Sequence, residues 1–366
     1  MQPNTEWMSA ELAERLLQLV NEGATVVLGD RPDLTPGLAN SSQNDQKLLH
    51  AVEAMWDGTF TKVEDPSGSV EIRKIGKGRV VKGPYQAGTF LPLGLSPDFV
   101  FHAEKGQSPG NIAWNHRSTS DSDIYFVANQ DSVEKELTLS FRVSGRVPEL
   151  YDPVSGRTIK AKSWASDGVR TSLPVRFAPN ASWFVLFREN TSERSSASGK
   201  NWPEFRDASS LEGNWKVQFD PQLGGPKGIA EFKSLGDWSK DADSLIRYYS
   251  GTAVYTKIFN WKKVKGDKRL WLNLGEVANI AEVKLNGVPC GVAWTAPYQV
   301  DITDAIRPGK NTLSVEVTNT WFNRMIGDLR LPEDKRITRT TAAFRFAGYP
   351  LAKAGLLGPV VIKSEE

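Results

Sequence analysis

The feature that most constrains the fold of this chain is a succession of short alternating or β-branched runs, separated by turn residues, which starts near residue 111. Examples are IAWNHR, DIYFVANQ, ELTLSFRV and SWFVLFRE. A period of two places successive side chains on opposite faces of a strand, and closely spaced turns join neighbouring strands antiparallel. We therefore predict an antiparallel β-sandwich over residues 105–190.

A second group of such runs fills residues 201–366, with NWKVQFD, AVYTKIFNW, RLWLNLG and NTLSVEVTN among them. Helical periodicity is weak there, which favours a second β-sandwich of about eight strands. The intervening stretch ENTSERSSASGKN is rich in serine and lacks aromatic residues. That composition predicts a flexible linker over residues 191–200.

The N-terminal part differs, because its apolar residues recur with the period of a helix. The expected elements are a helix over 9–22 with Ser9 as its N-cap, a strand over 24–28 buried on both faces, a helix over 46–56 and a strand over 79–85. Two strands are too few for a doubly wound sheet. We therefore predict a partial α/β unit over residues 1–104.

The composition excludes several classes of function. Lys and Arg number 45 against 43 Asp and Glu, so a net charge of +2 leaves no basic stripe for nucleic acid or anionic membranes. One cysteine and three histidines make a disulfide impossible within the chain and a metal centre improbable. No apolar run is long enough to span a bilayer, and the first residues lack the pattern of an export signal. Aromatic residues include 12 Trp, a side chain that both fills cores and stacks on sugars.

One run has a recognisable internal order, VKLNGVPCGVAWTAPYQVDITDAIRPGKNTLSVEVTN at 283–319. A strand reaches an Asn286-Gly287 turn, Trp294 lies on the loop that follows the next strand, and a Pro-Gly turn leads into the last strand. At this run the sequence resembles the galactose-binding-like jelly roll that serves many glycoside hydrolases as a sugar-binding domain.

Further runs extend the resemblance to a family. LEGNWKVQFDP, SLIRYYSGTAVYTKIF, LNLGEVANIAEVKLNG and TWFNRMIGDLRLP are similar to the C-terminal region of bacterial α-L-rhamnosidases of glycoside hydrolase family 106. Upstream, DIYFVANQ, FRVSGRVPELYDPVSG and RLLQLVNEGATVVLGDRPDLTPGLAN continue the similarity. The resemblance covers nearly the whole chain and implies a mainly β fold that ends in a galactose-binding-like jelly roll.

The resemblance leaves three hypotheses for function. In that family a catalytic (β/α)8-type barrel carries the acid and base and precedes these modules, so the first hypothesis is an accessory region that recognises sugar or supports glycosidic-bond hydrolysis. The second is a compact stand-alone glycosidase that uses two carboxylates from the jelly-roll loops. The third is a structural scaffold that docks a separate catalytic chain through its incomplete α/β sheet.

A glycosidase needs two carboxyl groups, about 5 Å apart for retention or roughly 6.5–9.5 Å apart for inversion. Glu276 in LGEVAN and Asp328 in NRMIGD stand in polar, aromatic-rich segments and are our catalytic candidates. Glu282, Asp301 and Glu204 are catalytic candidates of lower rank. The alternative is that all five are ordinary solvated carboxylates.

A sugar site combines exposed aromatic rings with polar donors and acceptors, because a pyranose has an apolar C–H face and a rim of hydroxyl groups. Our substrate-binding candidates are Arg247, Tyr249, Trp294, Tyr298, Trp321, Asn323 and Arg324. The alternative is that Trp294 and Trp321 are core residues and that Arg324 and Asp328 form a structural ion pair.

We expect no cofactor, although Asp301, Asp304 and Asn311 could supply oxygen ligands to a structural calcium ion. Carbohydrate is the expected partner, and nucleic acid and membranes are not. The incomplete α/β unit could also bind a second copy of the chain or a catalytic domain.

Overall fold

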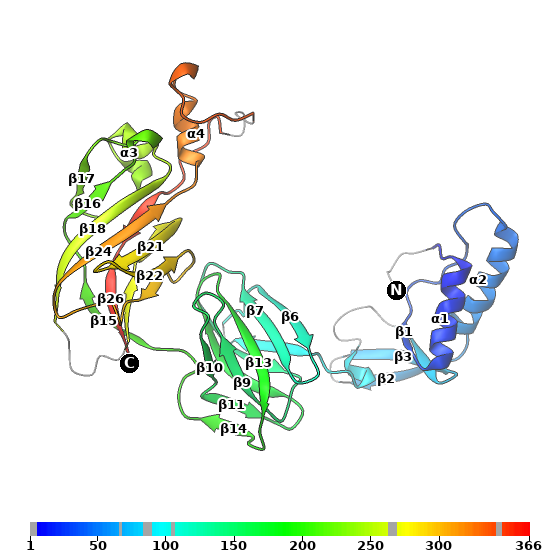
Figure 1. Cartoon of the computed structure of the whole chain (residues 1–366). Helices are drawn as coiled ribbons and strands as arrows, with labels where there is room; N and C mark the ends of the chain where they lie inside the picture. The colour runs from blue at the N-terminus through cyan, green and yellow to red at the C-terminus, as the bar shows by residue number, and fades with distance from the viewer. Residues whose placement is uncertain (1–5, 66–67, 83–89, 104–106, 263–268, 342–345) are drawn as a thin grey trace. The chain divides into compact units, whose positions relative to one another are not determined.

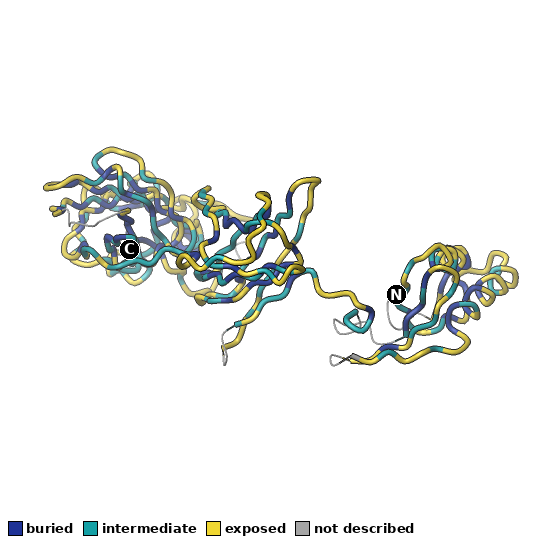
Figure 2. Tube along the Cα trace, turned by 90° about the horizontal axis from the view of Figure 1, so that it is seen from below, coloured by how far each residue is buried: buried dark blue, intermediate teal, exposed yellow. Residues whose placement is uncertain are grey.

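The computed structural model describes residues 6–65, 68–82, 90–103, 107–262, 269–341 and 346–366. The chain divides into two compact units, residues 1–100 and 101–366. The fold is mainly β, with a partial α/β unit followed by two β-sandwiches, as predicted (Figure 1). Buried residues lie in the interior of each part (Figure 2). No helix in these ranges is both long and apolar enough to cross a bilayer.

The first helix, α1 (Ala10–Glu22), begins at the predicted cap, where the Leu12 N–H donates to Ser9 Oγ at 3.3 Å. It ends at Gly23, whose φ of +129° is strained for residues with a Cβ. The second helix, α2 (Ser41–Trp56), begins five residues before the predicted start. The polar residues of its first turns fold into the helix because tertiary contacts hold them there, including a hydrogen bond from Thr35 Oγ1 to Asp45 Oδ1 at 2.6 Å.

The sheet of this unit has four strands in the order β1-β4-β3-β2. The strands are β1 (Thr25–Val27), β2 (Thr61–Asp65), β3 (Gly68–Ile75) and β4 (Gly78–Lys82). Only β1 and β4 are parallel. β1 is half-exposed and not buried on both faces, because it lies at the edge of the sheet and has one neighbour among the described strands. Of the strand predicted over 79–85, residues 83–85 lie outside the described ranges.

The helices cover one face of this sheet. Val80 joins the core that α1 and α2 form with buried Leu48 and Met55. The neighbouring Val81 points to the other face and packs with Val70 in a smaller cluster. This opposite placement of adjacent residues is the two-residue period of a strand.

The first sandwich contains two five-stranded sheets, β10-β9-β13-β7-β6 and β14-β11-β12-β8-β5. Their strands are β5 (Phe99–Ala103), β6 (Ile112–Ser118), β7 (Asp123–Asn129), β8 (Lys135–Phe141), β9 (Arg146–Tyr151), β10 (Thr158–Lys160), β11 (Ser163–Ser166), β12 (Thr171–Phe177), β13 (Ser182–Asn190) and β14 (Ser195–Ala197). In β12 every second residue is buried, as the alternation predicts. The core between the sheets contains Tyr125, Phe141 and Phe187, whose rings meet edge to face.

Two elements near the expected domain boundaries differ from the predictions. β5 lies before residue 104 but pairs in a sheet of the sandwich and not in the α/β unit. The Ser-rich stretch expected to be a flexible linker contains β14, which pairs antiparallel with β11. Just after it, the Asn201 amide donates to the carbonyls of Ser163 and Pro174 at 2.7 and 2.9 Å. Serine-rich composition does not prevent strand formation when a neighbouring strand offers hydrogen-bond partners.

The second sandwich has twelve strands among the described residues, where about eight were predicted. They are β15 (Phe205–Ser210), β16 (Trp215–Gln218), β17 (Ile229–Phe232), β18 (Thr252–Trp261), β19 (Leu270–Asn273), β20 (Glu276–Ala278), β21 (Ile280–Leu285), β22 (Val288–Ala293), β23 (Gln299–Asp301), β24 (Gly309–Thr318), β25 (Gly355–Gly358) and β26 (Val361–Glu365). Six of these strands have only three or four residues, too few for periodicity to reveal them.

These strands form a six-stranded sheet, β17-β16-β18-β24-β21-β22, a four-stranded sheet, β15-β26-β19-β23, and the pair β20-β25. Aromatic residues fill the core, and the Trp238 Nε1–H donates to the hydroxyl of buried Tyr255 at 2.6 Å. The Leu356 N–H donates to the same hydroxyl at 3.2 Å, which ties β25 to the six-stranded sheet. Burial raises the pKa of Tyr255, so its hydroxyl stays protonated as a core hydrogen-bonding group.

Candidate carbohydrate-binding site

The loops that carry most of the predicted site residues meet at one end of the six-stranded sheet. Thr318, the last residue of β24, pairs with Thr252 at the start of β18 and with Ile280 at the start of β21. Ala293, the last residue of β22, pairs with the second residue of β21. The short helices α3 (Ser244–Arg247) and α4 (Phe322–Asp328) lie at this same end (Figure 1).

Two exposed tryptophans belong to this end of the sheet. Trp294 directly follows β22 and has an exposed fraction of 57%. Trp321 follows β24 by three residues, precedes α4 and has an exposed fraction of 44%. The alternative that both indoles are core residues is therefore wrong. Their rings are available to a ligand, which is the property that sugar stacking needs.

Two further binding candidates, Tyr298 and Arg247, are partly engaged in contacts within the protein. Tyr298 is half-buried and packs against the core of the sandwich. The Arg247 guanidinium is tied to the loop before α3, because Nε donates to the Asp241 carbonyl and Nη2 to the Ala242 carbonyl, both at 2.7 Å. Arg247 therefore holds this loop in place, and a ligand would have to bind the N–H groups of the guanidinium that these two hydrogen bonds leave unused.

The binding roles predicted for Tyr249 and Asn323 are wrong. Tyr249 has no exposed area, its hydroxyl donates to the Thr252 carbonyl at 2.8 Å, and burial raises its pKa. Asn323 is 2% exposed, and its amide exchanges two hydrogen bonds with the backbone of Ala352. Both side chains hold the loops of this end in place and cannot stack on or contact a sugar at the surface.

Arg324 and Asp328 form the structural ion pair of the alternative interpretation. Arg324 Nε lies 3.1 Å from Asp328 Oδ1, and both side chains are almost fully buried. The other oxygen of Asp328 accepts from the Ile337 N–H and from both the N–H and hydroxyl of Thr338. Asp328 Oδ1 faces the Arg324 guanidinium without a hydrogen bond, so the two side chains form a buried ion pair within the fold. The catalytic role of Asp328 and the binding role of Arg324 stay predictions.

Glu276 is placed differently, as the exposed first residue of strand β20, whose other two residues are buried. Its Oε1 lies 2.7 Å from Lys353 Nζ, and this hydrogen bond and charge raise the pKa of the Lys353 ammonium. Asp328, the other carboxylate of the predicted catalytic pair, is 2% exposed and is paired with Arg324. The catalytic role of Glu276 stays a prediction.

Sequence reasoning missed a cavity beside α4. It has a volume of about 140 Å³ and is lined by Met325, Asp328, Leu329, Glu333, Arg336, Thr338, Arg339 and Thr340. Most ligand pockets measure roughly 300–1,000 Å³, so this one admits at most the edge of a sugar ring. The available signal was the pair of arginines, Arg336 and Arg339, close after the helix, but no recognisable motif surrounds them.

Two of the three residues suggested for calcium, Asn311 and Asp301, have their oxygens engaged with other protein groups. Asn311 Oδ1 accepts hydrogen bonds from Asn286 Nδ2 at 2.7 Å and from the Arg307 N–H at 2.9 Å. Asp301 pairs with Arg269 and accepts from Thr303. In the ranges that the structure describes, no cluster of three or more His, Cys, Asp or Glu side chains has the arrangement of a metal site.

Comparisons with known proteins agree with this architecture. Residues 1–165 match the model of glycoside hydrolase family 106, described as α-L-rhamnosidase, and residues 238–346 match the galactose-binding-like domain of glycosyl hydrolase family 2. The structure of a rhamnosidase from Novosphingobium sp. PP1Y covers 99% of this chain, with a TM-score of 0.81 and 32% identity. This chain is related to the family 106 glycoside hydrolases.

The family 106 relationship confirms the predicted resemblance and the galactose-binding-like character of the C-terminal sandwich. A putative β-glucuronidase from Formosa agariphila is 45% identical over 126 residues, which are 34% of this chain and 11% of that protein. The chain spans about a third of the length of the Novosphingobium rhamnosidase, 32% of it. The relatives thus share the glycosidase name and differ in the sugar that the name specifies.

Proposed function

We propose that the C-terminal sandwich binds carbohydrate at the end of its six-stranded sheet and thereby supports glycosidic-bond hydrolysis. The observation that carries this proposal is the exposure of Trp294 and Trp321 at one end of a galactose-binding-like domain. An indole covers the apolar face of a pyranose, and loops on a rigid β scaffold are the usual place for binding residues.

Hydrogen bonds fix the backbone on both sides of Trp321. Asn319, between β24 and Trp321, donates to the Tyr249 carbonyl and accepts from the Gly251 N–H, both at 2.9 Å. Asn323 fastens the start of α4 to Ala352. A ligand that stacks on Trp321 would meet a ring whose backbone is already ordered, so binding costs little conformational entropy.

The test is a titration of the whole chain with L-rhamnose, D-galactose and D-glucuronate, followed by calorimetry and tryptophan fluorescence. We expect saturable binding of at least one sugar. Trp294→Ala or Trp321→Ala should weaken it about tenfold, which corresponds to about 1.4 kcal/mol.

Trp7→Ala is the matched control, because Trp7 has a similar exposed fraction, 51%, and belongs to the α/β unit. It should leave the affinity unchanged. An affinity that both Trp294→Ala and Trp321→Ala leave intact would contradict the proposed site, and the absence of binding to any of the three sugars would contradict the recognition role for them.

A second function is favoured by the surface of the α/β unit, and we propose that this unit also docks a catalytic domain. β1 pairs on one side only among the described strands. Large apolar side chains are also exposed on the helices and loops of this unit, with exposed fractions of 95% for Leu38, 50% for Leu12 and 45% for Leu49. Open strand edges and exposed large apolar side chains are typical of surfaces that become covered.

A further inference from the structure

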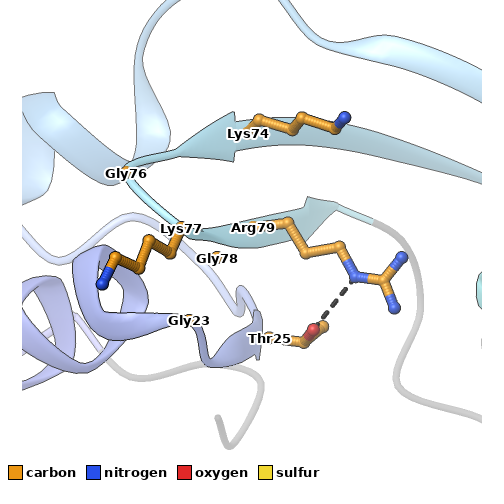
Figure 3. A pocket seen from close by; sticks show the side chains of 7 residues that line it. All are labelled: Gly23, Thr25, Lys74, Gly76, Lys77, Gly78 and Arg79. Carbon is orange, nitrogen blue, oxygen red and sulfur yellow. Dashed lines mark hydrogen bonds between the residues drawn. The ribbon is translucent and has the colours of Figure 1, made fainter.

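A cavity in the α/β unit, the unit that does not contain the proposed sugar site, has a volume of about 480 Å³. It is bounded by the β3–β4 hairpin and by the segment that joins α1 to β1 (Figure 3). Its lining consists of Gly23, Thr25, Lys74, Gly76, Lys77, Gly78 and Arg79. Three of these side chains are cations and none is a carboxylate.

Two of the cations face each other across the hairpin. Lys74 and Arg79 are directly opposite in the β3–β4 register, and both side chains extend in the same direction (Figure 3). Like charges at directly opposed positions destabilise a sheet. Among the described residues, neither has a carboxylate within ion-pair distance.

The guanidinium of Arg79 is positioned by neutral groups. Its Nε donates to Thr25 Oγ1 at 3.0 Å, and its Nη2 lies 3.4 Å from the Leu93 carbonyl. Neutral partners orient the group without cancelling its charge. Arg79 therefore presents a fixed cation at the cavity, with donors left over for an anion.

Lys77 has a structural explanation. Its side chain points the other way, toward α1, and its N–H donates to the Asn21 carbonyl near the end of this helix at 3.0 Å. α1 has no basic residue in its own last turn. A cation at that place complements the negative end of the helix dipole, which accounts for Lys77 without a ligand. The helix end does not account in the same way for Lys74 and Arg79, whose side chains point away from it.

The backbone under the cavity is held rigidly. A Cβ on Gly78 would lie 2.3 Å from the carbonyl oxygens of Val20 and Ala24, and one on Gly76 would lie 2.7 Å from Asn21 Cα. Only glycine permits the hairpin to press this closely on the α1–β1 segment. The two cations thus stand on a preorganised support, which lowers the entropic cost of binding.

We propose that this cavity binds an oxyanion, such as a carboxylate or phosphate, between Lys74 and Arg79. Arginine matches the geometry of two oxyanion oxygens with its planar fork, and lysine adds a point charge from the opposite strand. The anion is either a free inorganic ion or the acidic group of a saccharide. The proposal does not depend on sugar binding by the C-terminal sandwich.

The test is a titration of the ¹⁵N-labelled whole chain at constant ionic strength, with inorganic phosphate, D-glucuronate and neutral D-galactose in separate arms. The amide signals of Gly76 and Gly78 report on the cavity. We expect a saturable shift with an anion and none with galactose. Saturation by glucuronate alone assigns the acidic group of a saccharide, and saturation by phosphate, alone or with glucuronate, assigns a general oxyanion site.

Lys74→Gln should weaken the binding roughly tenfold, because one of two facing charges is lost. The Lys74 side chain has no hydrogen-bond partner among the described residues, so this variant should remain folded. Lys47→Gln, which removes an exposed cation on α2, is the matched control and should bind like the natural chain. The proposal is overturned if neither anion gives saturable shifts at Gly76 and Gly78, or if both variants weaken binding equally.

Discussion

At the scale of single residues, the buried pair Arg324–Asp328 shows how a charged residue in a loop region can serve the fold. Each charge is removed from water, and the pair is tolerated because Asp328 also accepts from Thr338 and from the Ile337 N–H. These bonds fasten the segment after α4 to the helix. The pair therefore supports the end of the sheet where Trp321 is exposed.

Asp328→Asn should lower the free energy of unfolding by about 3 kcal/mol, because it leaves the Arg324 cation buried without a counter-charge. Urea unfolding followed by tryptophan fluorescence measures this loss. Glu276→Gln is the matched comparison, since its ion pair with Lys353 is exposed to solvent, and its unfolding should not change measurably. Equal stability of Asp328→Asn and the natural chain would refute the structural role of the pair.

At the scale of elements, the β21–β22 hairpin determines where Trp294 stands. Asn286 and Gly287 form its turn with φ values of +54° and +81°. The Asn286 amide also donates to the Ala305 carbonyl at 2.9 Å, and its oxygen accepts from the Thr312 N–H at 3.0 Å. The turn is thus fixed both by its local conformation and by neighbouring segments. It sets the first pairs of the hairpin, and a register shift between Lys284 and Val283 then sets the pairing of the rest of β22.

Gly287→Ala should destabilise the chain by about 1 kcal/mol, because a Cβ is strained at this φ although the space around it is open. Gly236→Ala is the control, since that glycine also has open space and its φ is not positive. It should be neutral or slightly stabilising. Thermal unfolding of both variants checks this, and similar destabilisation by the two would show that backbone strain at Gly287 is not the cause.

At the scale of the whole molecule, the chain contains separate cores that serve different surfaces. The C-terminal sandwich carries the exposed tryptophans, and the α/β unit carries the exposed leucines and the oxyanion cavity. No described residue belongs to more than one of the α/β and C-terminal core clusters. The proposed sugar site and the proposed oxyanion cavity therefore belong to different cores.

If the α/β unit docks a catalytic domain, Leu38→Lys and Leu12→Lys together should abolish complex formation with the catalytic barrel domain of a family 106 enzyme. Multi-angle light scattering of the mixture measures the complex. Trp294→Ala, which changes an exposed apolar residue of the other unit, should leave it intact. A mixture that remains two separate species with the natural chain would count against docking, and a complex made by the double variant would place the interface elsewhere.

Much of the fold could be predicted from the sequence, because it depends on residues close together in the chain. Ser9 caps α1, alternation marks β12, and Asn286-Gly287 forms the expected turn. The strand β14 could not be predicted, because the strand that it pairs with among the described residues, β11, is more than twenty residues away in the sequence. The half-exposure of β1 likewise depends on its place at the edge of a sheet.

The candidate site likewise has features that the sequence specifies and features that depend on tertiary structure. The sequence by itself determined that aromatic and polar residues gather in the loops of a galactose-binding-like sandwich, because turn residues and strand periodicity specify which segments are loops. Only the tertiary structure decided that Trp294 and Trp321 are exposed while Tyr249 and Asp328 are buried. The physical reason is that burial depends on which distant segments pack over a side chain, and residue type alone does not specify that packing.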